Sequence, residues 1–563
     1  MSGSPGTTPS AAPTPTLRER VRSRSILSAN EELLRAVPPA RLLACFAQVF
    51  ENSASQGWTD TAASMDDSVV ELSASLTEPS ASSKPADHEA ADSVFYASEL
   101  VSKVDGFISH VWSDSRWLKA LALYYYVNVN FAICASITTW LVLVVGMIAM
   151  HGPAGMGGDP VLLPLFVLAP TAVFLCGILL GHHARTPVKY LWLDKLCIHQ
   201  TRTALKVMGV SALPEVVGSS DRLVVLWSAS YFERLWCNAE LATFVALGQD
   251  VHSVEMVPLW LAPWIFSAMM LDVVSIFLSG RLFVLIPMLG GFLAEHLSVA
   301  WLVNFLAQFI GIGIAFSVAY LPVVLPSLLT FRMKLDNHAH MFEQCKSFRL
   351  AHAKCTLESD RNIVEQLVKD LFSHSSDPIK EFDRFVAEDL SRHVAANVGG
   401  EAGLPYKLCL LAYLPLAFSA AANILGCDDM PCDVAAGAEL GAGASAAQQM
   451  LTNLLAWSVG VFGIYPSTLP VLLALMAASR RHFAGRPGAR FVGDCLAIVA
   501  ANLYMGFHEG FAAGLVNTAS AQGLKSSAAS ALWGSATVAY LALLVVWNRY
   551  LFNPGNASTA ALD

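Results

Sequence analysis

The chain has 563 residues, of which 55% are hydrophobic and only 14% are charged. Soluble domains carry about 25% charged residues, so this deficit, with a mean hydropathy of +0.50, predicts an integral membrane protein in contact with a lipid bilayer. The net charge of −9 argues against a nucleic-acid partner, which would favour a basic surface. The eleven cysteines include no CxxC pair, which argues against a zinc site or a disulfide scaffold.

The N-terminal part, residues 1–94, is predicted to be a disordered tail with one amphipathic helix and an acidic linker. Residues 1–30 are rich in Ser, Pro and Thr and lack an apolar core run, so we expect no signal peptide and a cytosolic N-terminus. Apolar residues at helical spacing predict the amphipathic helix between Glu31 and Glu51, broken at Pro38-Pro39. The Ser/Ala-rich stretch from Asn52 to Ala91 predicts the linker.

About eight membrane spans are predicted, because a span needs about 20 predominantly apolar residues. The predicted spans are Leu121–Met150, Val161–Gly181, Pro258–Gly280, Val299–Leu325, Pro405–Leu425, Leu451–Ala477, Phe491–Val516 and Ala528–Val546. The segment Arg281–Leu297 is apolar but contains Glu295 and His296, and both a further span and a re-entrant piece stay open for it.

The basic residues predict that both termini are cytosolic. Lys and Arg collect on the cytosolic side of membrane proteins. They follow the second, fourth and eighth predicted spans and lie between the sixth and seventh, whereas the opposite loops carry only Arg281 and Lys525. Cys427 and Cys432 fall in an outer loop, where a disulfide and two free thiols are both open.

Two stretches of the first half alternate between strands and helices. Strands are predicted at Val104–His110, Val188–Leu193, Arg222–Trp227 and Ser253–Leu259, and helices at Ala204–Val217 and Tyr231–Leu247. This alternation predicts a doubly wound α/β unit with a parallel sheet, which binds ligands at the carboxyl ends of its strands. The polar residues at those ends are His110, Asp194 and Ser228.

The predicted organisation has further parts. A transmembrane hairpin, residues 121–181, interrupts the α/β unit of residues 95–120 and 185–259. Apolar stripes at Asp360–Phe372 and after the cap Asp377-Pro378 predict a cytosolic helical segment that could also cover the edge of the sheet. The other parts are the spans in 260–326, the helical segment 327–404, the spans in 405–551 and a C-terminal tail, 552–563.

Three stretches, FISHVWSD, WLDKLCIHQ and LVVLWSASYFERLWCNAEL, together resemble the Toll/interleukin-receptor (TIR) domain. The resemblance covers Ser102–Asn128 and Val188–Leu259, and its most specific part is Trp236-Cys237-x-x-Glu240. It implies a flavodoxin-like fold that self-associates, or associates with other TIR-like domains, in signalling. A subset of TIR domains hydrolyses NAD at the nicotinamide–ribose bond with the glutamate that corresponds to Glu240.

On that reading NAD is a substrate and no bound cofactor is required. A carboxylate close to the ribose would stabilise an oxocarbenium-like transition state. Trp236 lies one helical turn before Glu240, and Phe107 and Ser109 at the end of the first strand could line the pocket. The alternatives stay open: Glu240 could be an ordinary surface carboxylate, Trp236 a core anchor and the module a pure adaptor.

The membrane part offers a different reading, because charged groups within spans are frequently functional. The polar residues concerned are Asp272, Asp494, Asn502, His508 and Glu509. A polar stripe facing the interior of a bundle could move ions or protons, whereas hydrogen bonding between helices is the structural alternative. The sequence therefore predicts a multi-pass signalling or scaffold protein that cleaves NAD as the sharper hypothesis, with a transporter or channel as the alternative.

Overall fold

The computed structural model describes residues 33–50, 95–151, 162–184, 187–200, 202–247, 250–355, 358–400, 403–425, 446–523 and 527–553. The chain folds into two compact units, each assembled from segments that are far apart in the sequence. The α/β unit comprises Met1–Lys119, Pro187–Val257 and Cys345–Leu390, and the helical unit comprises Ala120–Thr186, Pro258–Gln344 and Ser391–Asp563. Cys427 and Cys432, the predicted linker and most of the predicted tails lie outside the described residues.

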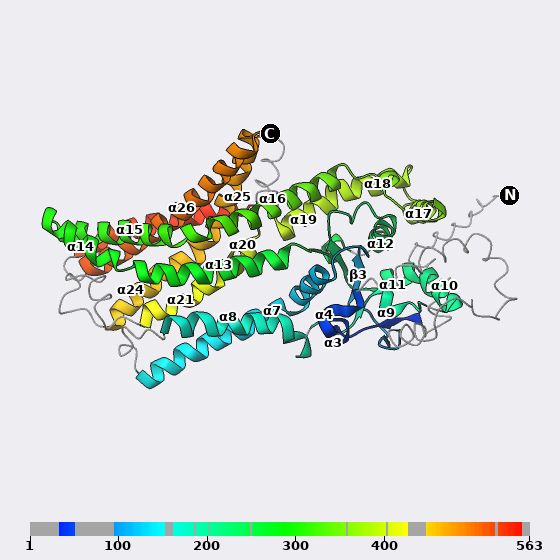
Figure 1. The fold of residues 1–563 in the computed structure, drawn as a ribbon, viewed down its shortest axis with the longest axis horizontal. Coiled ribbons are helices and arrows are strands. Elements are labelled where there is room, and N and C mark those ends of the chain that lie inside the picture. Colours follow the sequence, from blue (N-terminus) through cyan, green and yellow to red (C-terminus); the bar gives the residue numbers. More distant parts are fainter. Residues whose placement is uncertain are drawn as a thin grey trace, which may run out of the picture. The chain divides into compact units, whose positions relative to one another are not determined.

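The α/β unit is organised around a four-stranded sheet with the order β4-β3-β5-β6. Its strand β3 is labelled in Figure 1. Strand β3 (Gly106–His110) pairs in parallel with β4 (Leu191–Trp192) and with β5 (Leu223–Trp227), and β6 is Val254–Pro258. Every residue of β3 and β5 is buried, as expected for parallel strands that are covered on both faces. The predicted strand segments on the two sides of the hairpin therefore meet in one sheet.

The helices of the α/β unit differ in detail from the prediction. The single helix expected at Ala204–Val217 is two helices, α10 (Thr203–Ser211) and α11 (Leu213–Ser219), because Pro214 begins a new first turn. The short α9 is Asp194–Cys197, and α12 (Leu235–Ala246) begins only after the turn that follows β5. The helix after β3 is not separate, because α7 runs without a break from Arg116 to His151.

The prediction of an amphipathic helix at Glu31–Glu51 is wrong for the described part, residues 33–50. These residues form strand β1 (Arg35–Ala36), two short helices, α3 (Pro39–Leu42) and α4 (Ala44–Ala47), and a 3-10 turn. Strand β1 pairs antiparallel with β2 (Glu99–Leu100). The next residue, Val37, exchanges two hydrogen bonds with Leu191, at 2.8 and 2.9 Å. Pro38 ends this extended piece, which covers the β4 edge of the sheet.

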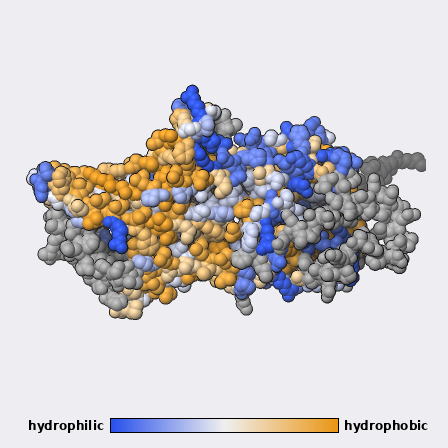
Figure 2. All heavy atoms as spheres, in the orientation of Figure 1, coloured by the Kyte–Doolittle hydropathy of each residue, from blue (hydrophilic) through white to orange (hydrophobic). Residues whose placement is uncertain are grey.

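The helical unit has the composition of a polytopic membrane protein. Seven stretches of the described residues are helical, long and apolar enough to cross a membrane: Arg116–Met150, Leu162–His183, Leu261–His296, Ala300–Lys346, Leu451–His482, Pro487–Ser520 and Ala531–Leu551. Large apolar side chains are exposed on them, and Figure 2 shows mostly hydrophobic residues over the surface around α14 and α15. Such a surface is suited to a lipid bilayer.

The helices of this unit are α8 (Leu162–Leu180), α13 (Leu261–Leu282), α14 (Leu285–His296), α15 (Ala300–Ala319), α16 (Val324–Lys346), α20 (Tyr406–Ala412), α21 (Leu414–Leu425), α24 (Ala446–Val459), α25 (Tyr465–His482), α26 (Pro487–Gly523) and α27 (Ser527–Leu551). Helix α26 packs along α15 (Figure 1). A π-helical turn, η9 (Gly460–Ile464), joins α24 to α25.

Two of the predicted membrane segments differ from continuous spans. Pro405–Leu425 is divided at Tyr413 into α20 and α21, because Pro415 stands in the first turn of α21 and cannot continue the preceding helix. In the open segment Arg281–Leu297, the first two residues end α13 and Leu285–His296 form α14, whose 12 residues reach only about 18 Å at about 1.5 Å per residue. This length is too short for a span of its own.

The predicted cytosolic helical segment is divided between the two units. Its part in the α/β unit contains α17 (Glu358–Leu371), α18 (Pro378–Phe385) and the π-helical turn η7 (Val386–Leu390), whereas α19 (Ser391–Val398) belongs to the helical unit. Asp377 accepts a hydrogen bond from the Lys380 amide at 3.3 Å and so caps α18 as the sequence predicts. Helix α17 packs on α12.

Candidate functional site

The candidate site lies where β3 and β5 end. Ser109 and His110 are the last residues of β3, Ser228 follows β5, and Asp194 opens α9 shortly after β4. In the order β4-β3-β5-β6, the connection after β3 leads to β4 on one side of it, whereas the connection after β5 leads to β6 on the other side. In α/β sheets this reversal opens a crevice at the carboxyl ends of the strands, where ligands bind.

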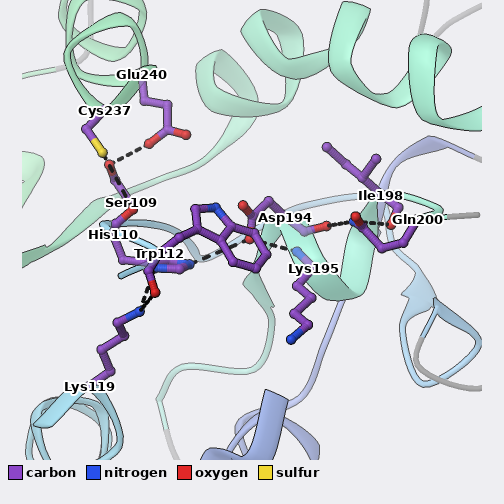
Figure 3. Close-up of polar contacts among 10 residues, drawn as sticks. All are labelled: Ser109, His110, Trp112, Lys119, Asp194, Lys195, Ile198, Gln200, Cys237 and Glu240. Carbon is purple, nitrogen blue, oxygen red and sulfur yellow. Dashed lines mark hydrogen bonds and ion pairs between the residues drawn. The ribbon is translucent and has the colours of Figure 1, made fainter. Parts of the chain in front are cut away.

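Glu240 reaches this end of the sheet from α12 (Figure 3). The Ser109 hydroxyl donates a hydrogen bond to Glu240 Oε2 at 2.5 Å, and the Tyr231 hydroxyl lies 2.8 Å from Ser109 Oγ. Ser109 and Tyr231 are fully buried. Burial raises the pKa of Glu240 to about 8 despite the opposing effect of the Ser109 hydrogen bond. The carboxyl is therefore mostly protonated at neutral pH unless a cation approaches it.

A second cluster of polar side chains lies around the imidazole of His110 (Figure 3). His110 Nε2 lies 3.6 Å from Asp194 Oδ1, and His110 Nδ1 lies 3.4 Å from Lys119 Nζ. Lys119 also donates to the Trp112 carbonyl at 3.0 Å. Asp194 Oδ1 accepts the Lys195 amide at 2.7 Å, which fixes the carboxylate at the start of α9. A buried lysine and a carboxylate thus lie on either side of one histidine.

The other predicted pocket residues have partners of their own. Trp236 donates its indole N–H to Asp360 on α17 at 2.9 Å. Phe107 is fully buried and stacks on Trp192, with ring centroids 4.5 Å apart. The structure therefore brings Ser109, His110 and Asp194 to the end of the sheet that Glu240 reaches, whereas Trp236 joins α12 to α17.

Ser228 lies at the edge of this region. Its hydroxyl is 3.0 Å from that of Ser230, which donates to Asp114 at 3.3 Å. Asp114 belongs to the loop after β3, so these bonds join the loops that follow two neighbouring strands.

Two residues of the site were not singled out by the sequence: Tyr231 and Lys119. Tyr231 follows the third strand closely, and that position alone could have marked it. Lys119 is one of two cations, with Arg116, at the beginning of a long apolar helix, a place where a buried charge calls for a partner. Cys237 donates from Sγ to the His110 carbonyl at 3.5 Å, and burial raises the pKa of its thiol well above the usual value, so it is a structural thiol.

Within the described ranges, no three His, Cys, Asp or Glu side chains are grouped to hold a metal ion.

In the helical unit, Asp272 of α13 accepts hydrogen bonds where α20 and α21 are interrupted. It accepts the Tyr320 hydroxyl at 2.5 Å and the Leu416 amide at 3.0 Å, and it is 2% exposed. Leu416 lies in the first turn of α21, where backbone amides have no partner inside the helix. The carboxylate of Asp272 therefore compensates for the interruption at Tyr413.

The four polar residues of α26 meet different neighbours. Asp494 accepts a hydrogen bond from Arg332 Nε at 2.6 Å, and His508 Nδ1 lies 3.0 Å from the Tyr540 hydroxyl. Glu509 lies against Gly460 of the π-helical turn, and Asn502 is buried. These contacts join α26 to several elements, and the Glu509 carboxyl also interacts with Tyr465 of α25.

Comparisons with protein-family models, with curated proteins and with solved structures find no match to this chain.

Proposed function

We propose that the chain is a multi-pass membrane signalling protein whose α/β unit is TIR-like and hydrolyses NAD at the nicotinamide–ribose bond. The observation that carries this proposal is the position of Glu240. Its carboxyl lies 2.5 Å from Ser109 at the carboxyl end of β3, the end at which sheets with this strand order bind nucleotides. The strand order, second-first-third-fourth in chain order, matches the beginning of the flavodoxin-like order.

The reaction breaks the bond between ribose C1′ and the nicotinamide nitrogen. Nicotinamide leaves as a neutral molecule and takes the bonding electron pair, and the positive charge passes to the ribose as an oxocarbenium ion. Water then adds at C1′ and releases a proton, so the products are ADP-ribose, nicotinamide and a proton. An ionised Glu240 beside C1′ stabilises the cationic transition state.

The raised pKa of Glu240 fits this role. Before substrate binds, burial keeps the carboxyl mostly protonated at pH 7, and its pKa is about 8. The nicotinamide ring of NAD is cationic, so its approach favours the ionised carboxylate. Ser109 then donates to the carboxylate, and Tyr231 orients Ser109. Substrate binding is thereby coupled to loss of the Glu240 proton.

The test is NAD consumption by the full-length protein in lipid nanodiscs, followed as nicotinamide release. We expect turnover by the wild type and a loss of at least about 100-fold in Glu240→Gln, which keeps the shape and removes the charge. The matched control is Glu255→Gln, the same change at an exposed ion pair of the same unit, 41% exposed and 3.7 Å from Arg222. The control should keep wild-type turnover.

A folded wild type without turnover, or a Glu240→Gln variant with full turnover, would remove the catalytic proposal. The α/β unit would then stand as an assembly module, and concentration-dependent self-association of the protein would be its measurement. Transport through the polar residues of the spans remains an untested prediction. Asp272, Asp494 and His508 have hydrogen-bond partners in other helices, as expected of polar residues that hold helices together. Flux in proteoliposomes of wild type against Glu509→Gln tests it.

A further inference from the structure

A cavity of about 530 Å³ in the helical unit has four arginines among its nine lining residues. Arg332 and Asp336 come from α16, Arg480 comes from the last turn of α25, and Arg486 and Arg490 flank the start of α26. The sequence marks these arginines only as a general cytosolic bias of positive charge. The fold brings arginines from three helices to one hollow.

Acidic side chains neutralise only part of this charge. Asp336 pairs with Arg480 at 2.8 Å and with Arg490 at 3.5 Å, and the buried Asp494 holds Arg332 at 2.6 Å. With the four arginines and two aspartates charged, the wall carries a formal charge of +2 (four minus two). A hollow with this surplus attracts an anion.

Hydrogen-bond donors remain available in this wall. Among the described residues, the side chain of Arg486 has no ion pair, and the buried Nη2 of Arg332 and Nε of Arg490 have no hydrogen-bond acceptor. The carboxylates hold Arg332, Arg480 and Arg490 in place, so little side-chain entropy is lost when these groups bind a ligand. Guanidinium groups match the geometry of phosphate oxygens.

The beginning of α26 adds a further attraction for an anion. Arg490 donates its amide to the Arg486 carbonyl at 2.9 Å, so the amides before Arg490 have no partner inside the helix. The 37-residue helix directs the positive end of its dipole to this place. A Cβ placed on Gly488 meets no atom within 4 Å, so the backbone of this first turn is open to a ligand.

Exposed apolar side chains lie next to two of the arginines that line the cavity. On α26, Phe491 and Val492 follow Arg490 directly and are 43% and 56% exposed, and on α16 Leu329, one turn before Arg332, is 70% exposed. The same helices thus present arginines at the cavity and lipid-facing residues within a turn of it. This juxtaposition is the one expected where a phospholipid headgroup meets a membrane protein.

We propose that this cavity, walled by Arg332, Arg480, Arg486 and Arg490, binds a phosphate group, supplied by the headgroup of an anionic phospholipid. Free phosphate has the same chemistry, and the exposed apolar residues beside the cavity favour the lipid. Arg486, which has no ion pair among the described residues, completes the site when the ligand binds. Such a site would make the assembly of these helices depend on the lipid composition of the membrane.

The experiment titrates the full-length protein in neutral detergent with short-chain phosphatidic acid, inorganic phosphate and short-chain phosphatidylcholine, and measures each Kd. We expect saturable binding of phosphatidic acid and a Kd at least about tenfold weaker for zwitterionic phosphatidylcholine. A Kd for inorganic phosphate tenfold or more above that of phosphatidic acid assigns the lipid as the source. Similar values assign free phosphate and keep the phosphate site.

The variant series separates this cavity from a general basic surface. Arg486→Gln should weaken phosphatidic acid binding by at least about tenfold, and Arg486→Lys should weaken it less, since it keeps the charge and loses the planar fork. Arg481→Gln is the matched control, an exposed neighbouring arginine that does not line the cavity. Because Arg486 is exposed and has no described ion pair, its variants should keep the wild-type Tm. Binding of Arg486→Gln within twofold of the wild type, or an equal loss in Arg481→Gln, would overturn the proposal.

Discussion

The Ser109 hydroxyl donates to the Glu240 carboxyl at 2.5 Å, across 131 positions of the sequence and two intervening membrane helices. This contact joins the end of the first buried strand to the helix after the third. It places a carboxyl of raised pKa, about 8, at the end of the sheet where ligands bind.

Glu240→Gln should remove a pH dependence of stability. The pKa of Glu240 is about 8 in the folded protein, against an ordinary value of 4.5, so between these values the unfolded chain loses a proton that the folded protein keeps. The contribution of Glu240 to stability is therefore fully present below about pH 4.5 and falls as the pH rises towards about 8, by at most about 1.4 kcal/mol per pH unit. The Tm difference between Glu240→Gln and wild type should grow across this range. Glu255→Gln, at an exposed position, should follow the wild type; a constant difference for Glu240→Gln would contradict the assigned proton.

Trp236→Phe should loosen α17 from α12. The indole of Trp236 is the donor to Asp360 Oδ2, and the other oxygen of this buried carboxylate has no hydrogen-bond partner among the described residues. Loss of the indole leaves a buried carboxylate without that donor, at a cost of about 1–3 kcal/mol. Faster hydrogen exchange in Glu358–Leu371 is the expected readout. Trp117→Phe, at a tryptophan that is 55% exposed, should leave this exchange unchanged.

Asp272→Ala should lower the Tm of the helical unit. The change leaves the Leu416 amide and the Tyr320 hydroxyl without their acceptor, which costs about 1–3 kcal/mol for each buried group. Asp272→Asn keeps one acceptor oxygen and should lose about half as much. Thermal unfolding of both variants in the same detergent measures the order. If Asp272 carried protons instead, Asp272→Asn would abolish flux in proteoliposomes with an unchanged Tm.

Gly460→Ala should destabilise the contact between η9 and α26, because the added methyl group would meet the Glu509 carboxylate. Overpacking of this kind costs about 1–3 kcal/mol. Gly534→Ala on α27 is the matched control: its methyl group meets nothing within 4 Å, and replacing a mid-helix glycine gains about 0.5–1 kcal/mol. The two Tm shifts should therefore have opposite signs, and equal shifts would contradict the close approach of Glu509 to Gly460.

The local elements were largely predictable because their causes are local. Apolar runs of about 20 residues imply membrane helices whatever they pack against. Short apolar runs between turns implied β3, β5 and β6, and Asp377 before Pro378 implied the start of α18. The segment after Pro38 was not predictable in this way, because Val37 is extended only through its hydrogen bonds to Leu191, more than 150 positions away.

The amino-acid sequence by itself determined the class of the protein and the position of most helices and strands, and it pointed to Glu240 as a residue to test. Only the tertiary structure decided what each polar side chain meets: Ser109 for Glu240, Asp360 for Trp236, and Leu416 for Asp272. Hydropathy and helix propensity act over a few neighbouring residues, so a sequence displays them directly. A hydrogen bond or a basic cavity depends on which distant segments pack together, and that choice is made by the burial of whole faces of helices and sheets.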